Sequence, residues 1–311
     1  MRKIIGMGET IFDILFEENR PFKGVPGGSA FNTMISLGRL GLKPIFLSEL
    51  ARDHVGDLLL RFMEQNGVAT DHIYRYYGGQ SPLSLAFLDA NREAHYDFYF
   101  NYPPERLDVV WPRIDADDLF LFGSLFSVKP ELRQAVTDLL RYAADRKAIL
   151  VYDPNFRSES ASQTLHVMPS VIENLEFADI VRGSISDFRS LYRETDPDRI
   201  YRNHIRFYCP IFICSDGAGG VWLRTPLVSK HYDAPAVSLV STIGAGDSFN
   251  AGLLYALYRR GTLRDELAAL DEAAWDELIS VALGFAAEVC ESDENYISCD
   301  YARRLTGPTE G

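Results

Sequence analysis

Short apolar runs alternate along the chain with segments whose apolar residues recur at helical spacing. The run at 3–8 predicts a buried strand, and 29–40 carries apolar residues at roughly helical intervals before Gly41. After residue 104 the same alternation predicts a helix at 130–146 and strands at 119–123, 148–152, 179–182 and 211–215. Strands that alternate with helices predict an α/β fold with a mostly parallel sheet covered on both faces.

Between residues 73 and 100 the pattern changes to short β-rich segments with no helix between them. Strands are expected at 73–77, 83–89 and 95–100, separated by glycine, proline and asparagine. We expect a small antiparallel sheet that shares a strand with segment 11–16. Such a sheet could cover the carboxyl ends of the parallel strands, where ligands of these folds bind. The chain is therefore interpreted as one domain, 1–311, with a lid formed by about 11–25 and 72–107.

Composition and charge narrow the function classes. The formal net charge of −13 argues against nucleic-acid binding, although local dipoles can still attract an anionic substrate. The sequence has no signal-peptide run at its start and no apolar stretch long enough to cross a bilayer, which predicts a cytoplasmic protein with no membrane partner. Four dispersed cysteines and six histidines without metal-binding spacing predict reduced thiols and no direct metal site.

The most informative segment is S-T-I-G-A-G-D-S-F-N-A-G-L-L at 241–254. Gly244, Ala245 and Gly246 run into Asp247, and the apolar spacing that follows predicts a helix beginning near Gly246. Unpaired amides and the helix dipole at such a start favour an anion such as phosphate, and the dipole is expected to keep Asp247 ionised near neutrality. Asp247 could then accept a proton from a hydroxyl that attacks phosphorus. A glycine turn followed by an acidic residue that stabilises the helix explains an isolated motif of this kind equally well.

Other candidate binding residues lie in a strand or before a helix. Asp13 interrupts an apolar strand, where a carboxylate is costly unless it binds something, such as two neighbouring hydroxyls of a polyol. Gly27 and Gly28 precede a helix with Asn32 in its first turn, so a ligand could approach the backbone there and bond the amide. A plain turn and helix cap also explains these glycines.

Two loops after predicted strands are also candidates. In Asp153-Pro154-Asn155-Phe156-Arg157 the arginine could hold phosphate or sugar oxygens, or the segment could be a loop with an Asx turn. The run 215–220 could lie against a nucleotide or form a hairpin turn. No third glycine follows Gly6-Met7-Gly8 at the dinucleotide spacing and no P-loop motif is present, so a nucleotide would be held by another arrangement.

In their order and spacing these segments resemble the ribokinase/PfkB family of carbohydrate kinases, most of all its fructokinases. The resemblance extends from about Lys3 to Tyr301 and rests on G-M-G-E at Gly6, P-G-G with Asn32, L-G-R-L-G at 37–41, D-P-N-F-R and G-A-G-D. It implies a ribokinase-like three-layer α/β/α fold with a small β-sheet lid. The activity implied is ATP-dependent phosphorylation of a sugar hydroxyl.

The resemblance also implies roles for individual residues. Asp247 matches the catalytic base, and 244–246 match the anion hole. The positions that match sugar contacts are Asp13, Gly27, Gly28, Asn32, Phe98 and Arg157. The positions that match the ATP and phosphate side are Ser184, Asp187, Ser215, Gly217 and Gly220.

Two positions depart from the family pattern and bear on the ions. Ser241 stands where the family usually has an Asp that helps to hold a monovalent cation, so dependence on K⁺ stays open. The N-x-x-E motif reads Ser184-Ile185-Ser186-Asp187; we expect Mg²⁺ to be carried mainly by ATP, with Asp187 reaching it through water.

Three alternatives bear on the substrate and assembly. The acidic sugar 2-keto-3-deoxygluconate is the main rival to fructose, although it would favour an arginine-rich pocket. A second hypothesis is a catalytically silent sugar-binding or regulatory protein, because Ser241 and Ser184 depart from the pattern of the active kinases. The aromatic residues of the expected lid suggest a homodimer through the lids, as in many relatives, although packing within a small lid core also explains individual rings: Tyr74, Tyr76, Tyr77, Tyr96, Phe98, Tyr99 and Phe100.

Overall fold

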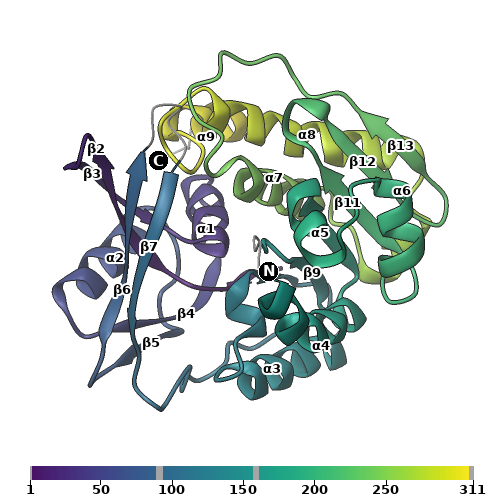
Figure 1. Cartoon of the computed structure of the whole chain (residues 1–311). Coiled ribbons are helices and arrows are strands. Elements are labelled where there is room, and N and C mark those ends of the chain that lie inside the picture. The colour runs from purple at the N-terminus through teal and green to yellow at the C-terminus, as the bar shows by residue number, and fades with distance from the viewer. Residues whose placement is uncertain (1, 89–93, 157–160, 308–311) are drawn as a thin grey trace.

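The structure is a computed structural model that describes residues 2–88, 94–156 and 161–307. Within these residues a nine-stranded sheet runs in the order β13-β12-β11-β10-β9-β8-β1-β4-β5 (Figure 1). Its strands are β1 Ile4–Met7, β4 Ile45–Ala51, β5 Ile73–Tyr76, β8 Leu119–Gly123, β9 Ile149–Asp153, β10 Ile180–Ser184, β11 Ile211–Ser215, β12 Val221–Arg224 and β13 Ser229–Tyr232. In the order of this sheet, the strands β5, β4, β1, β8, β9, β10 and β11 pair in parallel, each with the next. Strands β12 and β13 pair antiparallel at one edge.

Helices cover both faces of this sheet. The helices are α1 Ser29–Arg39, α2 His54–Gln65, α3 Arg133–Asp145, α4 Ala161–Phe177, α5 Ile185–Tyr192, α6 Pro197–Ile200, α7 Ala245–Arg260, α8 Glu272–Cys290 and α9 Cys299–Thr306. Short 3-10 or π turns lie at Leu125–Val128, Tyr201–Ile205, Gly217–Gly219 and Arg264–Ala269. In the described part of the chain, no helix is long and apolar enough to cross a membrane.

Successive residues of each central strand pack into two separate hydrophobic cores, one on each face of the sheet. Leu119 and Leu121 pack with α1, α2, α7 and α8, whereas Phe120 and Phe122 pack with α3 and α5. This follows from the strand geometry, because successive side chains point to opposite faces of a sheet. All five residues of β8 and of β9 are buried, as expected for strands covered on both sides. The predicted three-layer α/β/α fold is confirmed.

A second, smaller sheet stands apart from the body, and we call it the lid after the role predicted for it (Figure 1). It has the order β3-β2-β6-β7, with bounds β2 Ile11–Glu17, β3 Arg20–Gly27, β6 Gln80–Leu88 and β7 Ala94–Asn101. The sheet is mixed rather than antiparallel, because β2 and β6 pair in parallel. The reason is their connection: α1, β4, α2 and β5 lie between them in the chain, a crossover that a hairpin turn cannot supply.

One strand expected in the lid belongs to the large sheet. β5 pairs in parallel with β4, and its Ile73 and Tyr76 are buried. The β-rich pattern of residues 73–76 predicts a strand correctly but does not say which sheet edge it joins. The apolar side chain of Ile73 decides this, because it packs into the core under α1 and α2.

Candidate active site

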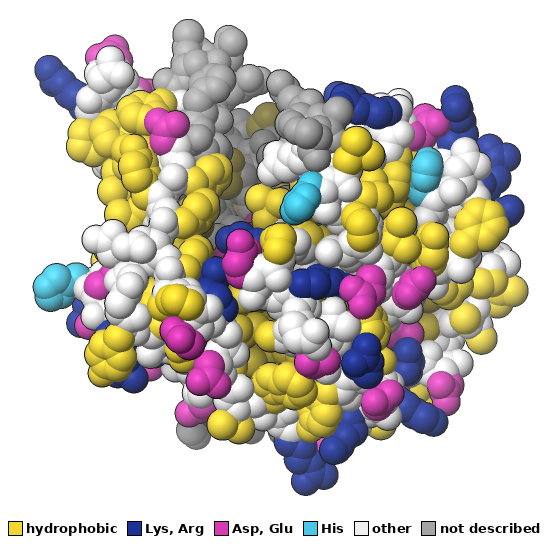
Figure 2. All heavy atoms as spheres, turned by 60° about the horizontal axis from the view of Figure 1, so that its bottom comes forward, with side chains coloured by type: hydrophobic (Ala, Val, Ile, Leu, Met, Phe, Trp, Pro, Cys, Tyr) yellow, Lys and Arg dark blue, Asp and Glu magenta, His cyan; other side chains and the backbone are white. Residues whose placement is uncertain are grey.

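The described residues that were predicted for the site lie on two sides of a hollow, on the small second sheet and at the carboxyl ends of the parallel strands (Figure 2). Figure 2 shows a hollow between the lid, on the left, and the helical body, with basic and acidic side chains at its edge. The carboxyl ends of β9, β10 and β11 and the start of α7 approach one another on the body side. This is the edge at which ligands bind in open α/β sheets.

The start of α7 is built on two glycines. Gly244 precedes the helix with φ of 81°, and a Cβ there would clash with the backbone of Asn295, so the position requires glycine. A Cβ on Gly246 would lie 3.0 Å from Nη1 of Arg182. The N–H of Ala245 donates to the Thr242 carbonyl at 3.3 Å, while the next amides of the first turn lack intrahelical acceptors by their position. Helix start and guanidinium together make a positive environment suited to an anion.

Asp247, in the first turn of α7, is held by side chains of α1. Ser29 Oγ donates to one carboxylate oxygen at 2.6 Å, and Asn32 Nδ2 donates to the other at 2.8 Å. Thr33 Oγ also donates to the Asp247 carbonyl at 2.9 Å. Burial raises the pKa of Asp247 to about 6, against the opposing hydrogen bonds from Ser29 and Asn32. The helix start therefore does not keep the pKa in its usual range, but the carboxylate is ionised at neutral pH and can take a proton there.

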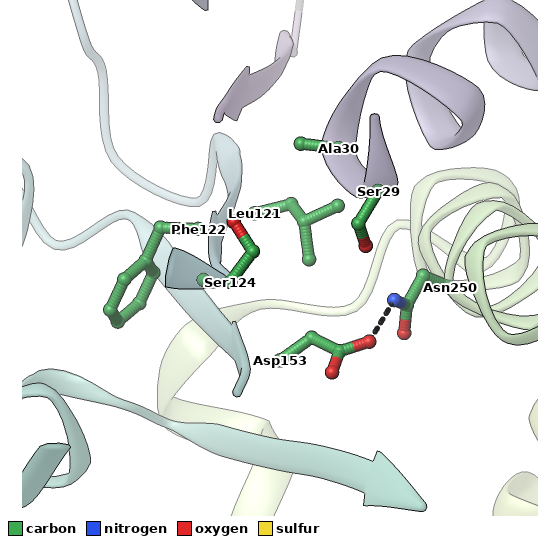
Figure 3. A pocket seen from close by; sticks show the side chains of 8 residues that line it. Ser29, Ala30, Leu121, Phe122, Ser124, Asp153 and Asn250 are labelled. Carbon is green, nitrogen blue, oxygen red and sulfur yellow. Dashed lines mark hydrogen bonds between the residues drawn. The ribbon is translucent and has the colours of Figure 1, made fainter. Parts of the chain in front are cut away.

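A small pocket beside this carboxylate reaches the end of β9. Figure 3 shows Ser29, Ser124, Asp153 and Asn250 around it. Asp153 Oδ2 accepts from Asn250 Nδ2 at 2.6 Å and from the buried Arg182 at 2.9 Å. The other oxygen, Oδ1, accepts the N–H of Asn155 at 3.0 Å, which is the Asx turn that the sequence left as an alternative. Asp153 is thus fully engaged within the protein.

The predicted sugar contacts on the lid side share one face of the sheet. Asp13, Ser84 and Phe98 stand opposite one another across β2, β6 and β7, and Ser84 Oγ donates to Asp13. Burial raises the pKa of Asp13. Gly27 makes room for this carboxylate, since a Cβ there would lie 3.0 Å from Asp13 Oδ2. Phe98 is 56% exposed and its ring stacks on that of Phe100, with the ring centres 5.6 Å apart.

The turn before α1 brings the remaining sugar candidates close to Asp247. Gly28 has φ of 125°, and a Cβ there would clash with the Glu9 carbonyl, so only glycine fits. Asn32 is buried and gives its amide to Asp247, while its Oδ1 has no partner among the described residues. Arg157, the remaining sugar candidate, lies outside the residues that the structure describes.

The predicted nucleotide residues lie at the ends of two neighbouring strands. Ser184 and Ser215 are register partners at the ends of β10 and β11, and Ser215 Oγ accepts from Arg182 at 2.9 Å. Gly217 and Gly220 in the following loop have φ of 51° and 86°. Both lie in the left-handed region that favours glycine.

Asp187 is turned into the protein rather than toward the surface. Its Oδ2 accepts the N–H of Ser184 at 2.7 Å and the Ser184 hydroxyl at 2.6 Å, which caps α5. Its Oδ1 is buried with no partner in the described chain, which leaves one acceptor for a bound water. Burial, and next the Asp153 carboxylate, raise the pKa of Asp187. The described residues contain no group of three or more His, Cys, Asp or Glu side chains that could hold a metal ion.

Ser241, the position that bears on K⁺, has a local partner. Its hydroxyl accepts the N–H of Ile243 at 3.2 Å. The hydroxyl thus stabilises the loop before α7, and the role of Ser241 toward a cation stays a prediction.

Three site residues were not identified from the sequence: Ser29, Arg182 and Asn250. Arg182 carries the same signal that singled out Asp13, a charged residue within an apolar strand, here I-V-R-G-S. Its two terminal nitrogens join the ends of β9 and β11, and its Nε is buried with no described partner. Ser29 is the first residue of α1, where small polar residues are common, so its local sequence carries no such signal. Asn250 lies in the second turn of α7, and a single asparagine among the residues of a helix does not mark a site.

Known proteins are similar to this chain in sequence and in architecture. Residues 1–296 match the pfkB family carbohydrate kinase. The chain is 25% identical over 282 residues to probable fructokinase-5 of Arabidopsis thaliana, covering 87% of each protein. It is 27% identical over 281 residues to the fructokinase of Rhizobium leguminosarum bv. trifolii, covering 87% of this chain and 85% of that protein. Aminoimidazole riboside kinase from Salmonella enterica, solved with aminoimidazole riboside and an ATP analog, superposes with a TM-score of 0.81 at 23% identity, over 98% of this chain and 100% of that one.

The fold, with its parallel sheet and β-sheet lid, together with the sequence match, defines a ribokinase-like enzyme that phosphorylates carbohydrates. The chain belongs to the pfkB family of carbohydrate kinases. The resemblance drawn from the ordered motifs is confirmed, as is the prediction that the protein is a kinase.

Proposed function

We propose that the protein transfers the terminal phosphoryl group of ATP to a hydroxyl of fructose, with Asp247 as the base. The observation that carries this proposal is the carboxylate at the start of α7, held on both oxygens by Ser29 and Asn32 and with its pKa raised to about 6. Two relatives named fructokinase, each matched over 87% of this chain, support the choice of fructose.

In the proposed reaction the sugar hydroxyl lies against Asp247 and attacks the phosphorus in line with the leaving ADP. Phosphoryl transfer passes through a loose transition state, so alignment and charge stabilisation carry most of the catalysis. The proton leaves late, and a carboxylate with a pKa of about 6 is a sufficient acceptor at neutral pH. Asp247 thus binds and orients the hydroxyl before it takes the proton.

The amides at the start of α7 and the Arg182 guanidinium face the charge that develops on the transferred group. Removal of one such donor typically costs about 3 kcal/mol, or roughly a hundredfold in rate. Mg²⁺ bound with ATP would neutralise phosphate charge. Asp187 would reach this ion only through water that enters beside its buried, unpartnered Oδ1. Ser215, Gly217 and Gly220 would border the nucleotide at the ends of the neighbouring strands.

The test is a coupled ADP-release assay with fructose, 2-keto-3-deoxygluconate, ribose and adenosine. We expect fructose to be the best substrate, and Asp247→Asn to abolish turnover while sugar binding, followed by calorimetry, persists. Asp233→Asn, at a fully exposed carboxylate, is the matched control and should be fully active. Near-normal turnover of Asp247→Asn would remove Asp247 from the role of base, and no turnover with any sugar would favour the silent binder.

For the assembly we propose a homodimer through the lids. The lid exposes large apolar side chains, with Phe22 49% and Tyr99 56% exposed. Exposed apolar patches of this kind favour a protein contact. Sedimentation should show a dimer that Phe22→Ser and Tyr99→Ser together weaken; a monomer at every concentration would contradict this proposal.

A further inference from the structure

Lys129 is a half-buried cation that no part of the mechanism above uses. It follows the turn Leu125–Val128 on the body, and its Nζ lies 5.0 Å from the ring centre of Phe100 and 5.2 Å from that of Tyr102. Phe100 belongs to β7 of the lid, so Lys129 bridges body and lid. Among the described residues, none accepts a hydrogen bond from this ammonium or forms an ion pair with it. Its three donors are therefore left for a ligand or water.

The charged groups around Lys129 differ in how many of their hydrogen-bonding atoms already have a partner. Glu49 and Arg106 form a closed ion pair through both carboxylate oxygens, and the Arg106 guanidinium stacks on Tyr102 at 3.7 Å. Burial lowers the pKa of Lys129, and the Glu9 carboxylate opposes that shift more than any other neighbouring charge. Glu9 is held by the Ser124 hydroxyl through Oε2 only. Glu9 and Lys129 are therefore both attached to the same short segment of the body, because Ser124 bonds Glu9 and Lys129 follows the turn that Ser124 begins.

This pair is connected to the proposed site along both walls of the cleft. On the body side, Ser124 lines the same pocket as Ser29, the partner of Asp247, and also holds Glu9. On the lid side, Phe98 stacks on Phe100, with ring centres 5.6 Å apart, and Phe100 stacks on Tyr102 at 6.0 Å. The stacked rings of Phe98, Phe100 and Tyr102 form an aromatic ladder. It starts opposite Asp13 and Ser84 and ends at Lys129. A sugar lying between Asp247 and the ladder would therefore point its far end toward Lys129 and Glu9.

We propose that Lys129 and Glu9 form a donor–acceptor pair that binds a hydroxyl at the end of the sugar away from Asp247. A hydroxyl both donates and accepts, so it can donate to the Glu9 carboxylate while it accepts from the Lys129 ammonium. The rings of Phe98 and Phe100 would cover the apolar C–H face of the same sugar. This inference rests on the proposed function and narrows its substrate class to neutral polyhydroxy sugars.

The charge balance of the cleft is the reason for choosing a neutral sugar. Among the described residues that we place around the sugar, Asp13, Glu9 and Asp247 carry carboxylates that are bonded by neutral hydroxyl groups, and Lys129 carries an ammonium without an ion pair. A sugar acid would bring a further negative charge next to Glu9, and like charges at short range repel strongly where water is partly excluded. The 2-keto-3-deoxygluconate alternative is therefore disfavoured.

The test compares Lys129→Met with wild type by calorimetric titration of fructose and by steady-state kinetics. A hydrogen bond to a charged group predicts a rise of roughly ten- to a hundredfold in the fructose Kd and KM. The ATP KM should stay within twofold. Lys147→Met is the matched control, because Lys147 is exposed and lies before β9, at the opposite edge of the sheet. Glu9→Gln should weaken fructose binding in the same way if Lys129→Met proves unstable.

The Kd values of mono-deoxy analogues of fructose distinguish a direct contact of Lys129 with the sugar from a purely structural role. One analogue should bind wild type weakly but bind Lys129→Met about as well as fructose does, because the variant no longer contacts the missing hydroxyl. An unchanged fructose Kd in both variants, or preference of wild type for 2-keto-3-deoxygluconate over fructose, would overturn this inference. Tight fructose binding without turnover would instead count against the proposed function alone.

Discussion

Replacing Asp247 with asparagine should change the pH dependence of stability in a direction fixed by its pKa. Burial raises that pKa from 3.8 to about 6, so the folded protein binds this proton more tightly than the unfolded chain does. The stability gained from protonation is fully present below about pH 4 and is lost as the pH rises through about 6. At about 1.36 kcal/mol per pKa unit, the free energy of unfolding of the wild type falls by about 3 kcal/mol as this carboxyl ionises. The asparagine variant does not titrate, so its free energy of unfolding does not fall for this reason.

The substitution also introduces a cost that does not depend on pH. Ser29 Oγ can still donate to the amide oxygen, but Asn32 Nδ2 would face another NH₂ group in place of the carboxylate oxygen. Such a mismatch costs about 1–3 kcal/mol, and because it is constant it cancels when two pH values are compared. The change with pH therefore isolates the contribution of the carboxylate.

The assay is urea unfolding followed by tryptophan fluorescence at a series of pH values between 4 and 8. The free energy of unfolding of Asp247→Asn minus that of wild type should become more positive by about 2.4 kcal/mol across this range, because at pH 4 the unfolded carboxyl is already partly ionised. Asp233→Asn is the control and should give a flat difference. The kcat/KM of wild type should fall below pH 6 for the same reason. A flat difference for Asp247→Asn would show that burial does not raise this pKa, and the reasoning would fail.

Three further predictions test other parts of the site. Asp13→Ala should raise the sugar KM severely with little change in the ATP KM, and an unchanged sugar KM would make Asp13 purely structural. Gly244→Ala should lower the free energy of unfolding by more than about 1 kcal/mol in urea titrations, since φ of 81° and the nearby Asn295 backbone exclude a Cβ. Asp153→Ala should cost about 3–5 kcal/mol, because it leaves the buried Arg182 without its counter-charge; a loss below about 1 kcal/mol would contradict that role.

The layered fold was predictable because its pattern is local. A strand covered on both faces must be apolar throughout, and β8 and β9 carry this signature in five residues each. The placement of β5 was not predictable from the same pattern, because strand propensity is a property of the segment and sheet membership is a property of its neighbours. The parallel pairing of β2 with β6 likewise depends on the whole crossover between them.

The chemistry of the site was predictable only where a residue conflicts with its surroundings. Asp13 conflicts with an apolar strand, and the glycines before α7 conflict with helix propensity, so both attract attention. Ser29 conflicts with nothing, yet it holds Asp247 from 218 positions away in the chain. Its contribution arises entirely from the packing of α1 against α7, which single-sequence patterns do not record.

Two carboxylates near the start of α7 acquire different properties through their partners. Asp153 forms an ion pair with Arg182 and also accepts hydrogen bonds from Asn250 and from a backbone amide, so both of its oxygens are bonded within the protein. Asp247 has only neutral donors, and the charge of Asp153 raises its pKa further while Arg182 lowers it. Different bonding partners of this kind allow two neighbouring carboxylates to take separate tasks. Arg182 is bonded to Asp153 rather than to Asp247, and burial raises the pKa of Asp247 to about 6, so this carboxylate can exchange a proton near neutral pH. The same guanidinium lies beside Gly246, at the position that the proposed mechanism gives to the phosphate.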